Sequence, residues 1–449
     1  MLSVADNETL CRVGPGTLMG DLFRQYWLPA ARSNELPAND GPPLRVKMLG
    51  EELIAFRTTS GDVGLIQNAC PHRGASLFFG RNEEEGLRCV YHGWKFDVAG
   101  ACVDMPSEPA ESNFKNKVHA KAYPVQERNG IIWTYMGPRE VPPPLPDLEA
   151  NMVEGATVST VLRRCNWMQA LEGDIDTIHF MFLHYGQLQA EDTYEGGFFR
   201  YQVESRGGYF SVQDTDFGAC YTMYREAEPD TYYHRIANFL FPCYTQVPPG
   251  TLAVKRQFRA WVPLDDDHVM YYGAGAPSYA KIENDPESQK RQFTRVQAMQ
   301  PDGTGWYERS RPIAQEENDY LIDREMQFNG ESYTGLPSVF LEDQALTESM
   351  GTIYERTQEH LGTTDSMIIR VRRSLIRAAE ALREAGVVPP GVDSPEVYAQ
   401  RSGGVILPRN VEWFEGTREL RKAFVQHSQE EINASLGRGS GEKAEITAG

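Results

Sequence analysis

Apolar and polar residues alternate in the first third of the chain as they do in short antiparallel strands. A turn signal at Leu49-Gly50-Glu51 separates two of the apolar runs. The strand-like runs are residues 44–48 (LRVKM), 53–56 (LIAF) and 131–135 (IIWTY). This pattern predicts a small antiparallel β domain with its core at about residues 44–136.

The proline-rich segment at residues 137–146 (GPREVPPPLP) can continue neither a strand interior nor a helix. We therefore predict a first domain at residues 1–138 and a second, larger unit at residues 139–436. The glycine-rich end at residues 437–449 resembles a flexible tail.

The second unit combines strand-like runs with one long helical pattern, which starts at about residue 364, continues to 384 and stops at Gly386 before two prolines. We expect the arginines of this helix to form a solvated face. The strand-like runs are residues 198–203, 221–224, 235–241 and 254–262. The arginines are Arg370, Arg372, Arg373, Arg377 and Arg383. Together, the two units predict an α+β fold.

The composition is that of a globular protein, with 41% apolar and 24% charged residues. A net charge of −19 and a pI near 5.0 argue against nucleic acid or an anionic membrane as a partner, because both would repel the surface. The sequence has no apolar stretch of about eighteen residues and no signal-peptide pattern at its start. We therefore predict a cytoplasmic location.

Two short motifs carry the most specific chemistry of the chain. Cys70-Pro71-His72 and Cys89-Val90-Tyr91-His92 form a C-x-H…C-x-x-H pair on two predicted loops, each followed by a nearby glycine. A Rieske [2Fe–2S] cluster uses two cysteine thiolates on one iron and two histidines on the other, which raises its reduction potential. The spacing therefore predicts that Cys70, His72, Cys89 and His92 hold a cluster that accepts electrons readily.

A zinc site is the alternative, since zinc binds two cysteines and two histidines tetrahedrally. Zinc fingers usually pair cysteine with cysteine and histidine with histidine, whereas each loop here supplies one of each, so the cluster is favoured. Neither loop carries a further cysteine for a disulfide between the loops, which favours a reducing compartment. We expect the other cysteines to be buried free thiols: Cys11, Cys102, Cys165, Cys220 and Cys243.

Residues 166–184 (NWMQALEGDIDTIHFMFLH) place a D-x-x-H-x-x-x-x-H string in an otherwise apolar, helix-like segment. On a regular helix, His179 lies about 60° to one side of Asp176 and His184 about 80° to the other. Histidines about 140° apart cannot both face one ion, so we expect an irregularity such as a wide turn between them. Glu172 shares a helix face with Asp176, either to hydrogen-bond nearby or to form a structural ion pair.

Two histidines and one carboxylate, with other positions open, form the facial triad with which non-heme Fe(II) activates O2. Taken alone, two histidines five residues apart are more often ordinary packed or exposed side chains. The upstream motif favours ligation, because an electron-accepting cluster needs a destination for its electron. The third ligand must come from elsewhere in the chain.

Through these motifs the chain resembles the α subunit of Rieske non-heme iron aromatic-ring oxygenases, in the phthalate-dioxygenase-like branch. The resemblance extends from about Arg12 to about Ala379 and includes N-W-x-x-x-L-E-G and the late Glu342-Asp343-Gln344-Ala345 with Glu348. It implies a helix-grip catalytic domain after the Rieske domain. It also implies that His179, His184 and Asp343 bind the mononuclear iron.

The resemblance gives Asp176 a different role, as a hydrogen-bonding bridge between His179 and His92 of a neighbouring subunit. It thereby implies a homotrimer or hexamer. Electrons would come from an NAD(P)H-dependent reductase of flavin or ferredoxin type, and O2 would be the co-substrate. The substrate implied is a small, phthalate-like aromatic carboxylic acid that becomes hydroxylated.

An aromatic acid requires a cation in its pocket. Arg225 and Arg235 are candidates because they lie in strand-like runs and because arginine binds carboxylates in a bidentate manner. A strand arginine more often faces solvent or pairs with an acid. Two other functions remain open: O-demethylation of a methoxylated aromatic acid, and an electron carrier fused to a ligand-binding domain.

Overall fold

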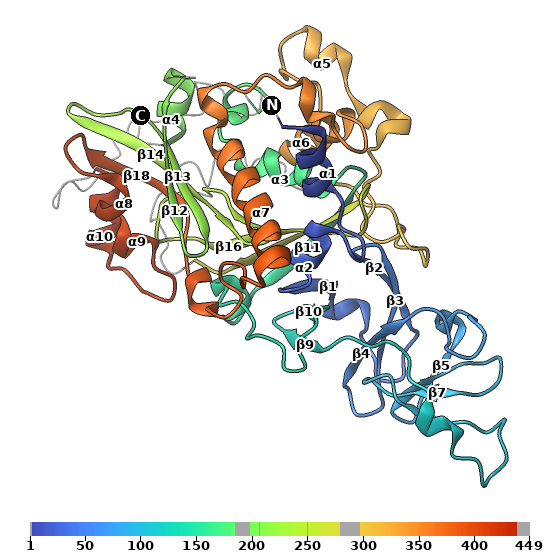
Figure 1. Cartoon of the computed structure of the whole chain (residues 1–449). Coiled ribbons are helices and arrows are strands. Elements are labelled where there is room, and N and C mark those ends of the chain that lie inside the picture. Colours follow the sequence, from blue (N-terminus) through green and yellow to red (C-terminus); the bar gives the residue numbers. More distant parts are fainter. Residues whose placement is uncertain (1, 185–197, 206, 249, 279–296, 438–449) are drawn as a thin grey trace.

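The computed structural model describes residues 2–184, 198–205, 207–248, 250–278 and 297–437. Its N-terminal part contains three small antiparallel sheets, one of which protrudes from the rest of the molecule (Figure 1). The first sheet has the order β1-β10-β9, with β1 at Trp27–Arg32, β9 at Val125–Arg128 and β10 at Ile131–Tyr135. The second is β2-β3-β4, with β2 at Leu44–Met48, β3 at Glu51–Arg57 and β4 at Val63–Gln67. The third is β5-β6-β7-β8, at Arg81–Glu83, Gly86–Arg88, Lys95–Phe96 and Cys102–Asp104.

The predicted strands at 44–48, 53–56 and 131–135 are therefore confirmed. Strand β3 connects the protruding sheet, β5-β6-β7-β8, to the rest of the molecule, because its side chains pack into both cores. Its side chains alternate between two faces: Leu53 and Ala55 pack into the main core, whereas Ile54 and Phe56 pack into a smaller core around the cluster loops. The domain boundary at residue 138 stays a prediction.

The larger part is built on an eight-stranded antiparallel sheet with the order β11-β17-β16-β15-β14-β13-β12, and β18 pairs with β14. Its earlier strands are β11 at Thr157–Arg163, β12 at Tyr209–Thr215, β13 at Gly218–Glu226 and β14 at Thr231–Leu240. Its later strands are β15 at Tyr244–Gln246, β16 at Arg256–Pro263, β17 at Val269–Ala276 and β18 at Gly403–Pro408. The predicted α+β class is confirmed, as are strands over the runs 221–224 and 235–241.

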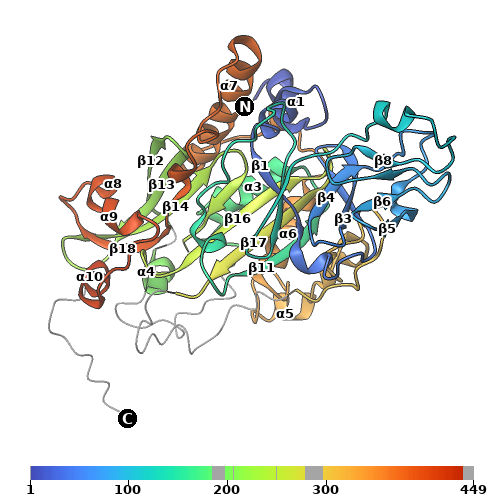
Figure 2. The same ribbon diagram turned by 90° about the horizontal axis from the view of Figure 1, so that it is seen from below.

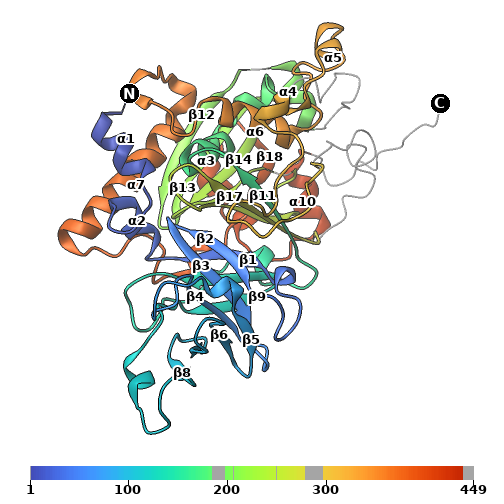
Figure 3. The ribbon, with the colours of Figure 1, turned by 90° about the vertical axis from the view of Figure 1, so that its right-hand side faces the viewer.

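Helices lie along and around this sheet (Figures 2 and 3). The first ones are α1 at Val4–Cys11, α2 at Leu18–Phe23, α3 at Trp167–Ile175, α4 at Phe198–Glu204 and α5 at Arg324–Phe328. The later ones are α6 at Val339–Ser349, α7 at Ser366–Ala385, α8 at Trp413–Gly416, α9 at Arg418–Arg421 and α10 at Gln429–Ser435. Helix α3 contacts α6 and strands β14, β15 and β16, so α3 and α6 are the helices that bring the site residues to the sheet. Within the described ranges, no helix has both the length and the apolar character to cross a membrane.

The predicted strand at residues 198–203 is wrong, because these residues belong to helix α4. A short apolar run does not distinguish a strand from a helix by its periodicity. An ion pair between side chains one helical turn apart favours the helix, since Arg200 Nε lies 2.8 Å from Glu204 Oε1. Its buried Gln202 side chain donates to the Tyr233 hydroxyl on β14.

Helix α7 confirms the long helical pattern and ends where predicted. Gly386 follows it with φ 63°, in the left-handed region that favours glycine. The expectation of a solvated arginine face is wrong for Arg372, which is buried and pairs with Glu172 and Glu359. A helix face that packs on other helices buries one of its arginines only where carboxylates meet it.

Candidate functional site

Two loops of the same shape carry the predicted cluster ligands. Gly74 N–H donates to the Cys70 carbonyl and Gly93 N–H donates to the Cys89 carbonyl, each at 2.9 Å. The φ angles of these glycines, 77° and 80°, lie in the region where other residues are strained. A Cβ on Gly93 would also lie 2.7 Å from Cγ of Pro106. The glycines therefore allow each loop to fold back on its cysteine.

In these loops the two thiols neighbour each other, and so do the two imidazoles. Cys70 and Cys89 are buried, and burial together with the neighbouring Cys89 raises the pKa of the Cys70 thiol to about 11. The Nδ1 atoms of His72 and His92 lie 3.1 Å apart, and both histidines are half-buried. Trp94 stacks on His72 at 4.4 Å between ring centroids. The thiols thus face the small core, while the imidazoles lie nearer the surface.

This pairing discriminates between a two-iron cluster and a single zinc ion. Among the described residues, one group of potential ligands has all its donor atoms within 4.8 Å of one another, namely His179, His184 and Asp343. The four loop side chains form no such group, as a tetrahedral ion would require. A thiol pair and an imidazole pair, each closely spaced, fit the two irons of a Rieske cluster.

The chain leaves regular α-helix geometry both before and between the two histidines. Helix α3 stops at Ile175, and Asp176 leaves the helical conformation with φ −83° and ψ 103°. Its Oδ1 atom accepts hydrogen bonds from the N–H groups of Ile178 and His179, at 2.9 and 3.4 Å. A short 3₁₀ helix then follows at His179–Met181. The expected irregularity between the histidines is confirmed, as a 3₁₀ turn and not as the wide turn given as an example, and the end of α3 at Ile175 precedes it.

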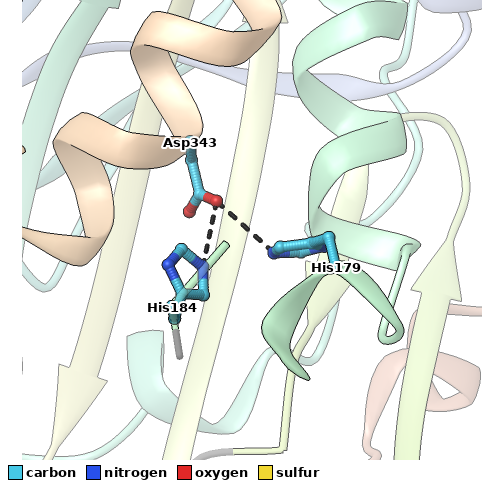
Figure 4. Close-up of side chains that lie close together, drawn as sticks. All are labelled: His179, His184 and Asp343. Atoms are coloured by element: carbon cyan, nitrogen blue, oxygen red, sulfur yellow. Dashed lines mark ion pairs between the residues drawn. The ribbon is translucent and has the colours of Figure 1, made fainter. Parts of the chain in front are cut away.

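His179, His184 and Asp343 converge on one point (Figure 4). The Nε2 atoms of His179 and His184 lie 3.4 and 3.2 Å from Oδ1 of Asp343. The two imidazole rings are 5.1 Å apart between centroids. Two nitrogens and one carboxylate oxygen, drawn from the segment after α3 and from α6, are a donor set that suits non-heme iron.

The electrostatics of this point favour a cation. Burial would lower the pKa of His184, but its hydrogen bonds to Asp343 and Glu342 outweigh burial and raise the pKa to about 9. Burial would raise the pKa of Asp343, but the two histidines hold it well below its usual range. Carboxylates thus hold positive charge on the imidazole, and a divalent ion would supply that charge when bound.

The two histidines differ in what holds their other ring nitrogen. Nδ1 of His184 lies 2.6 Å from Oε2 of Glu342, and Thr334 Oγ1 donates to Oε1 of the same carboxylate at 2.5 Å. Nδ1 of His179 is buried and has no hydrogen-bond partner among the described residues. Its nearest recorded acid is Asp176, at 3.8 Å. The sequence motif included Glu342, but nothing in the motif indicated this contact.

Asp174 is a second carboxylate near the site that the sequence reasoning left without a role. Its side chain is buried, and it accepts hydrogen bonds from Thr245 Oγ1 at 2.6 Å and Trp261 Nε1 at 2.8 Å. Arg259 forms an ion pair with it. One signal was available: Asp174 and Asp176 lie about 200° apart on a helix, so only one of them can face the histidines. Asp174 fastens the end of α3 to strands β15 and β16.

Glu172 forms the structural ion pair that was one of the two expectations for it. Its carboxylate pairs with Arg356 at 3.2 Å and Arg372 at 2.5 Å. Arg356 is fully buried and also donates to Oδ1 of Asn7 at 3.0 Å. Burial would raise the pKa of Glu172, but the two guanidinium groups hold it below its usual range. This network joins α1, α3 and α7 behind the site.

Arg235 is buried beside the segment that carries the histidines. Its Nε donates to Thr177 Oγ1 at 3.2 Å, and one terminal nitrogen donates to Gln202 Oε1 at 3.0 Å. Its guanidinium carbon lies 4.7 Å from the centroid of the Phe180 ring. No ion pair with a carboxylate is recorded for Arg235 among the described residues. The expectation that this strand arginine faces solvent is wrong, whereas its pairing with an acid stays a prediction.

Arg225 is also buried, and it neighbours Arg235 across strands β13 and β14. One of its terminal nitrogens donates to the carbonyls of Tyr201, Gln202 and Ser205 at the end of α4. Burial, with the nearby charge of Arg235, lowers the pKa of Arg225 to about 10. These contacts are those of a residue that caps a helix end.

Known proteins resemble both parts of the chain. The family described as Rieske [2Fe-2S] domain matches residues 26–124, and the family described as LigXa C-terminal domain like matches residues 134–435. The chain is 45% identical to the 3-chlorobenzoate-3,4-dioxygenase oxygenase subunit of Comamonas testosteroni, over 92% of this chain and 97% of that protein. It is 33% identical to the phthalate 4,5-dioxygenase oxygenase subunit of Pseudomonas putida, over 92% and 94%.

Two further similarities extend this set. The 5,5'-dehydrodivanillate O-demethylase oxygenase subunit of Sphingobium sp. (strain NBRC 103272 / SYK-6) is 31% identical over 85% of this chain and 81% of that protein. Among solved structures, dicamba monooxygenase bound to dicamba matches with a TM-score of 0.54 at 20% identity. That match covers 81% of this chain and 98% of the other, and it shows a common fold.

Proposed function

Because the chain belongs to the Rieske non-heme iron oxygenases, as an oxygenase subunit of the phthalate-dioxygenase-like branch, we propose that it hydroxylates a small aromatic carboxylic acid. Enzymes of this family use a [2Fe–2S] cluster, a mononuclear iron and O2. Relatives named as oxygenases extend over nearly the whole chain, which excludes the electron-carrier alternative.

One observation carries the choice of an acid, the buried charge of Arg235. Arg235 has no carboxylate partner among the residues that the structure describes, and a buried guanidinium in that state is costly unless a ligand compensates it. Arg235 contacts Thr177 and Phe180, which belong to the same short segment as His179 and His184. A carboxylate bound to Arg235 would therefore hold its aromatic ring beside the three convergent donors. The names of two relatives, a chlorobenzoate and a phthalate dioxygenase, support this substrate class.

We assign the metal-binding residues from the geometry of the two sites. Cys70, His72, Cys89 and His92 would hold the cluster, and the other site, formed by His179, His184 and Asp343, would hold the mononuclear iron. When bound, the cluster supplies single electrons and the iron supplies the activation of O2. The chain's own contribution is to orient the imidazoles, to hold the substrate carboxylate and to keep charge balanced at Asp343.

We further assign Asp176 the bridging role between protomers. Its carboxylate lies on a half-exposed turn, 3.8 Å from the partnerless Nδ1 of His179. In a homotrimer or hexamer it would link His179 to the partner subunit's His92. The oxygenase depends on a separate electron-transfer protein, and we propose an NAD(P)H-dependent reductase of flavin or ferredoxin type.

The experiment compares Arg235→Gln with Arg225→Gln. The second arginine is also buried, but its terminal nitrogens donate to carbonyls at the end of α4 and to the sulfur atoms of Met181 and Met223. The loaded enzyme is assayed for O2 uptake and product with an NADH-linked reductase, across phthalates, hydroxybenzoates and chlorobenzoates. Loss of one charge-assisted hydrogen bond, about 1.5–3 kcal/mol, predicts that Arg235→Gln lowers kcat/KM roughly 10- to 150-fold, mainly through KM. Arg225→Gln should leave KM within about threefold and lower the thermal stability instead.

Equal effects of both variants on KM would contradict the assignment of Arg235. Activity of the wild-type enzyme on non-acidic aromatics alone would contradict the acid substrate.

O-demethylation is the second candidate, because one relative 31% identical to this chain is named as an O-demethylase. The ligands do not distinguish the two outcomes, since the orientation of the substrate decides which atom is oxidised. Formaldehyde with a product lighter by one methylene would identify demethylation. A product that gains oxygen, without formaldehyde, would identify hydroxylation.

A further inference from the structure

Glu342 is a buried carboxylate whose single ion-pair partner among the described residues is His184. It is fully inaccessible to solvent, and within the described part of the chain no arginine or lysine forms an ion pair with it. Its recorded partners are the His184 imidazole at 2.6 Å and the Thr334 hydroxyl at 2.5 Å. Isolated buried carboxylates are strongly disfavoured, so positive charge must reach Glu342 through His184.

The two ring nitrogens of His184 face different carboxylates, which explains how the imidazole links Glu342 to the proposed metal site. Nδ1 of His184 faces Glu342, while Nε2 faces Asp343 at 3.2 Å. A carboxylate that accepts the Nδ1–H bond fixes the ring orientation and the tautomer, which leaves the Nε2 lone pair for a metal. It also makes the imidazole a more basic, stronger ligand. Thr334 in turn orients the carboxylate from its other oxygen.

We propose that Glu342 is a positioning residue for the mononuclear iron, acting through His184, and that Thr334 supports it. This inference rests on the proposed function of His179, His184 and Asp343 as iron ligands. The motif that resembles known oxygenases includes Glu342 only as the neighbour of the ligand Asp343. The structure gives it a separate task on the opposite side of the imidazole from the metal.

The same helix supplies a matched control. Glu348, also on α6, accepts hydrogen bonds from the Arg164 N–H at 2.9 Å, the Tyr320 hydroxyl at 2.7 Å and the Gln344 amide at 3.0 Å. It contacts none of the three proposed iron ligands through a recorded hydrogen bond or ion pair. Glu348→Gln therefore replaces a hydrogen-bonded carboxylate on the same helix and leaves the contacts of His179, His184 and Asp343 unchanged.

The experiment measures metal affinity in the full-length protein that retains its Rieske cluster. After removal of the mononuclear iron, Co(II) is titrated into the wild type and into Glu342→Gln, Glu348→Gln, Thr334→Val and His184→Ala, and its visible absorption is recorded. We expect Glu342→Gln to weaken Co(II) binding roughly 10- to 100-fold and to change the Co(II) spectrum. Glu348→Gln should bind as the wild type does, and Thr334→Val should bind a few-fold more weakly.

Each outcome has a defined meaning. If Glu342→Gln binds Co(II) with wild-type affinity and spectrum while His184→Ala does not bind, the positioning role is wrong and the iron site stands. If the wild-type protein, with its cluster in place, binds no Co(II), the proposed mononuclear metal site is wrong, and the role of Glu342 is wrong with it. If Glu342→Gln does not fold, Thr334→Val decides, because unchanged binding in that variant overturns the supporting contact.

Discussion

The two histidines of the proposed mononuclear site differ in their burial and in the partners of their ring nitrogens. His184 is almost fully buried, and both of its ring nitrogens face carboxylates from helix α6. His179 is a quarter exposed, its Nε2 faces the same Asp343, and its Nδ1 has no hydrogen-bond partner among the described residues. Both ring nitrogens of His184 are thus engaged within the chain, whereas the buried Nδ1 of His179 lies without a hydrogen bond, 3.8 Å from Asp176 on a half-exposed turn.

The difference separates two tasks that one metal site must perform. A ring held on both sides fixes where the metal would lie, because turning the ring would break the Nδ1 contact with the buried Glu342 and the Nε2 contact with Asp343. Beside His179, the partly exposed carboxylate of Asp176, 3.8 Å from the buried Nδ1, can accept a contact from outside the chain. We therefore propose that the His184 side determines metal affinity and that the His179 side, through Asp176, determines communication with another group.

The largest effect should follow from removing the enclosed ligand. His184→Ala should reduce the iron content from about three to about two atoms per chain, since the cluster contributes two and the facial triad one. Oxygen uptake coupled to product should disappear, while the visible absorption of the cluster persists. Iron analysis and absorption spectra on the same sample check this. Retention of a third iron would show that His184 is no ligand and would remove the asymmetry.

The asymmetry also explains how much of the site the sequence could predict. The cluster ligands lie in two short loops with fixed spacing, so the motif itself specified them. The partners of His184 lie on α6, far along the chain, and only the resemblance indicated Asp343. Nothing in the motif distinguished Glu342 from a surface acid, because its burial depends on how α6 packs on the rest of the site.

The errors have both local and non-local causes. The helix end at Asp176 was not predicted, because the irregularity was expected between His179 and His184 and Asp176 was considered only as a bridge between subunits. Residues 198–203 were predicted as a strand because a short apolar run has no diagnostic period. Arg372 was expected in solvent because its carboxylate partners, Glu172 and Glu359, come from other segments.

A smaller effect should follow from loosening helix α3, which leads into the His179 side. Glu172→Gln leaves the buried Arg356 and Arg372 with one fewer carboxylate. Breaking a buried ion pair costs about 3–5 kcal/mol in the free energy of unfolding. Urea unfolding at pH 7 should show this loss. The exposed pair Glu8–Arg12 is the control, because Glu8→Gln should cost no more than about 0.5 kcal/mol.

The pH dependence of that difference has a defined sign. The pKa of Glu172 is lowered in the folded protein, so its ionised form stabilises the fold above the unfolded-state pKa. This contribution is lost as the pH falls through the lowered folded-state pKa. The gap in stability between the wild type and Glu172→Gln should therefore be constant near neutral pH and should close in acid. A gap that persists at a pH where Glu172 is protonated would show that packing, and not charge, is responsible.

The smallest of these effects tests the His179 side directly. Asp176→Asn removes the negative charge beside Nδ1 of His179 but keeps a side-chain oxygen to accept from the N–H of Ile178. Because Asp176 is not a proposed ligand, iron content should stay at the wild-type value. Turnover should fall roughly 10- to 100-fold, or about 1.4–2.7 kcal/mol, as for loss of a supporting partner of a metal ligand. Stopped-flow reoxidation of the reduced cluster with substrate and O2 should slow by the same factor. Asp214→Asn, at an exposed aspartate paired with Arg370, is the control and should leave both rates unchanged. Full turnover in Asp176→Asn would show that the Asp176 carboxylate beside His179 has no part in electron transfer. The surroundings of the two histidines would then differ in burial alone.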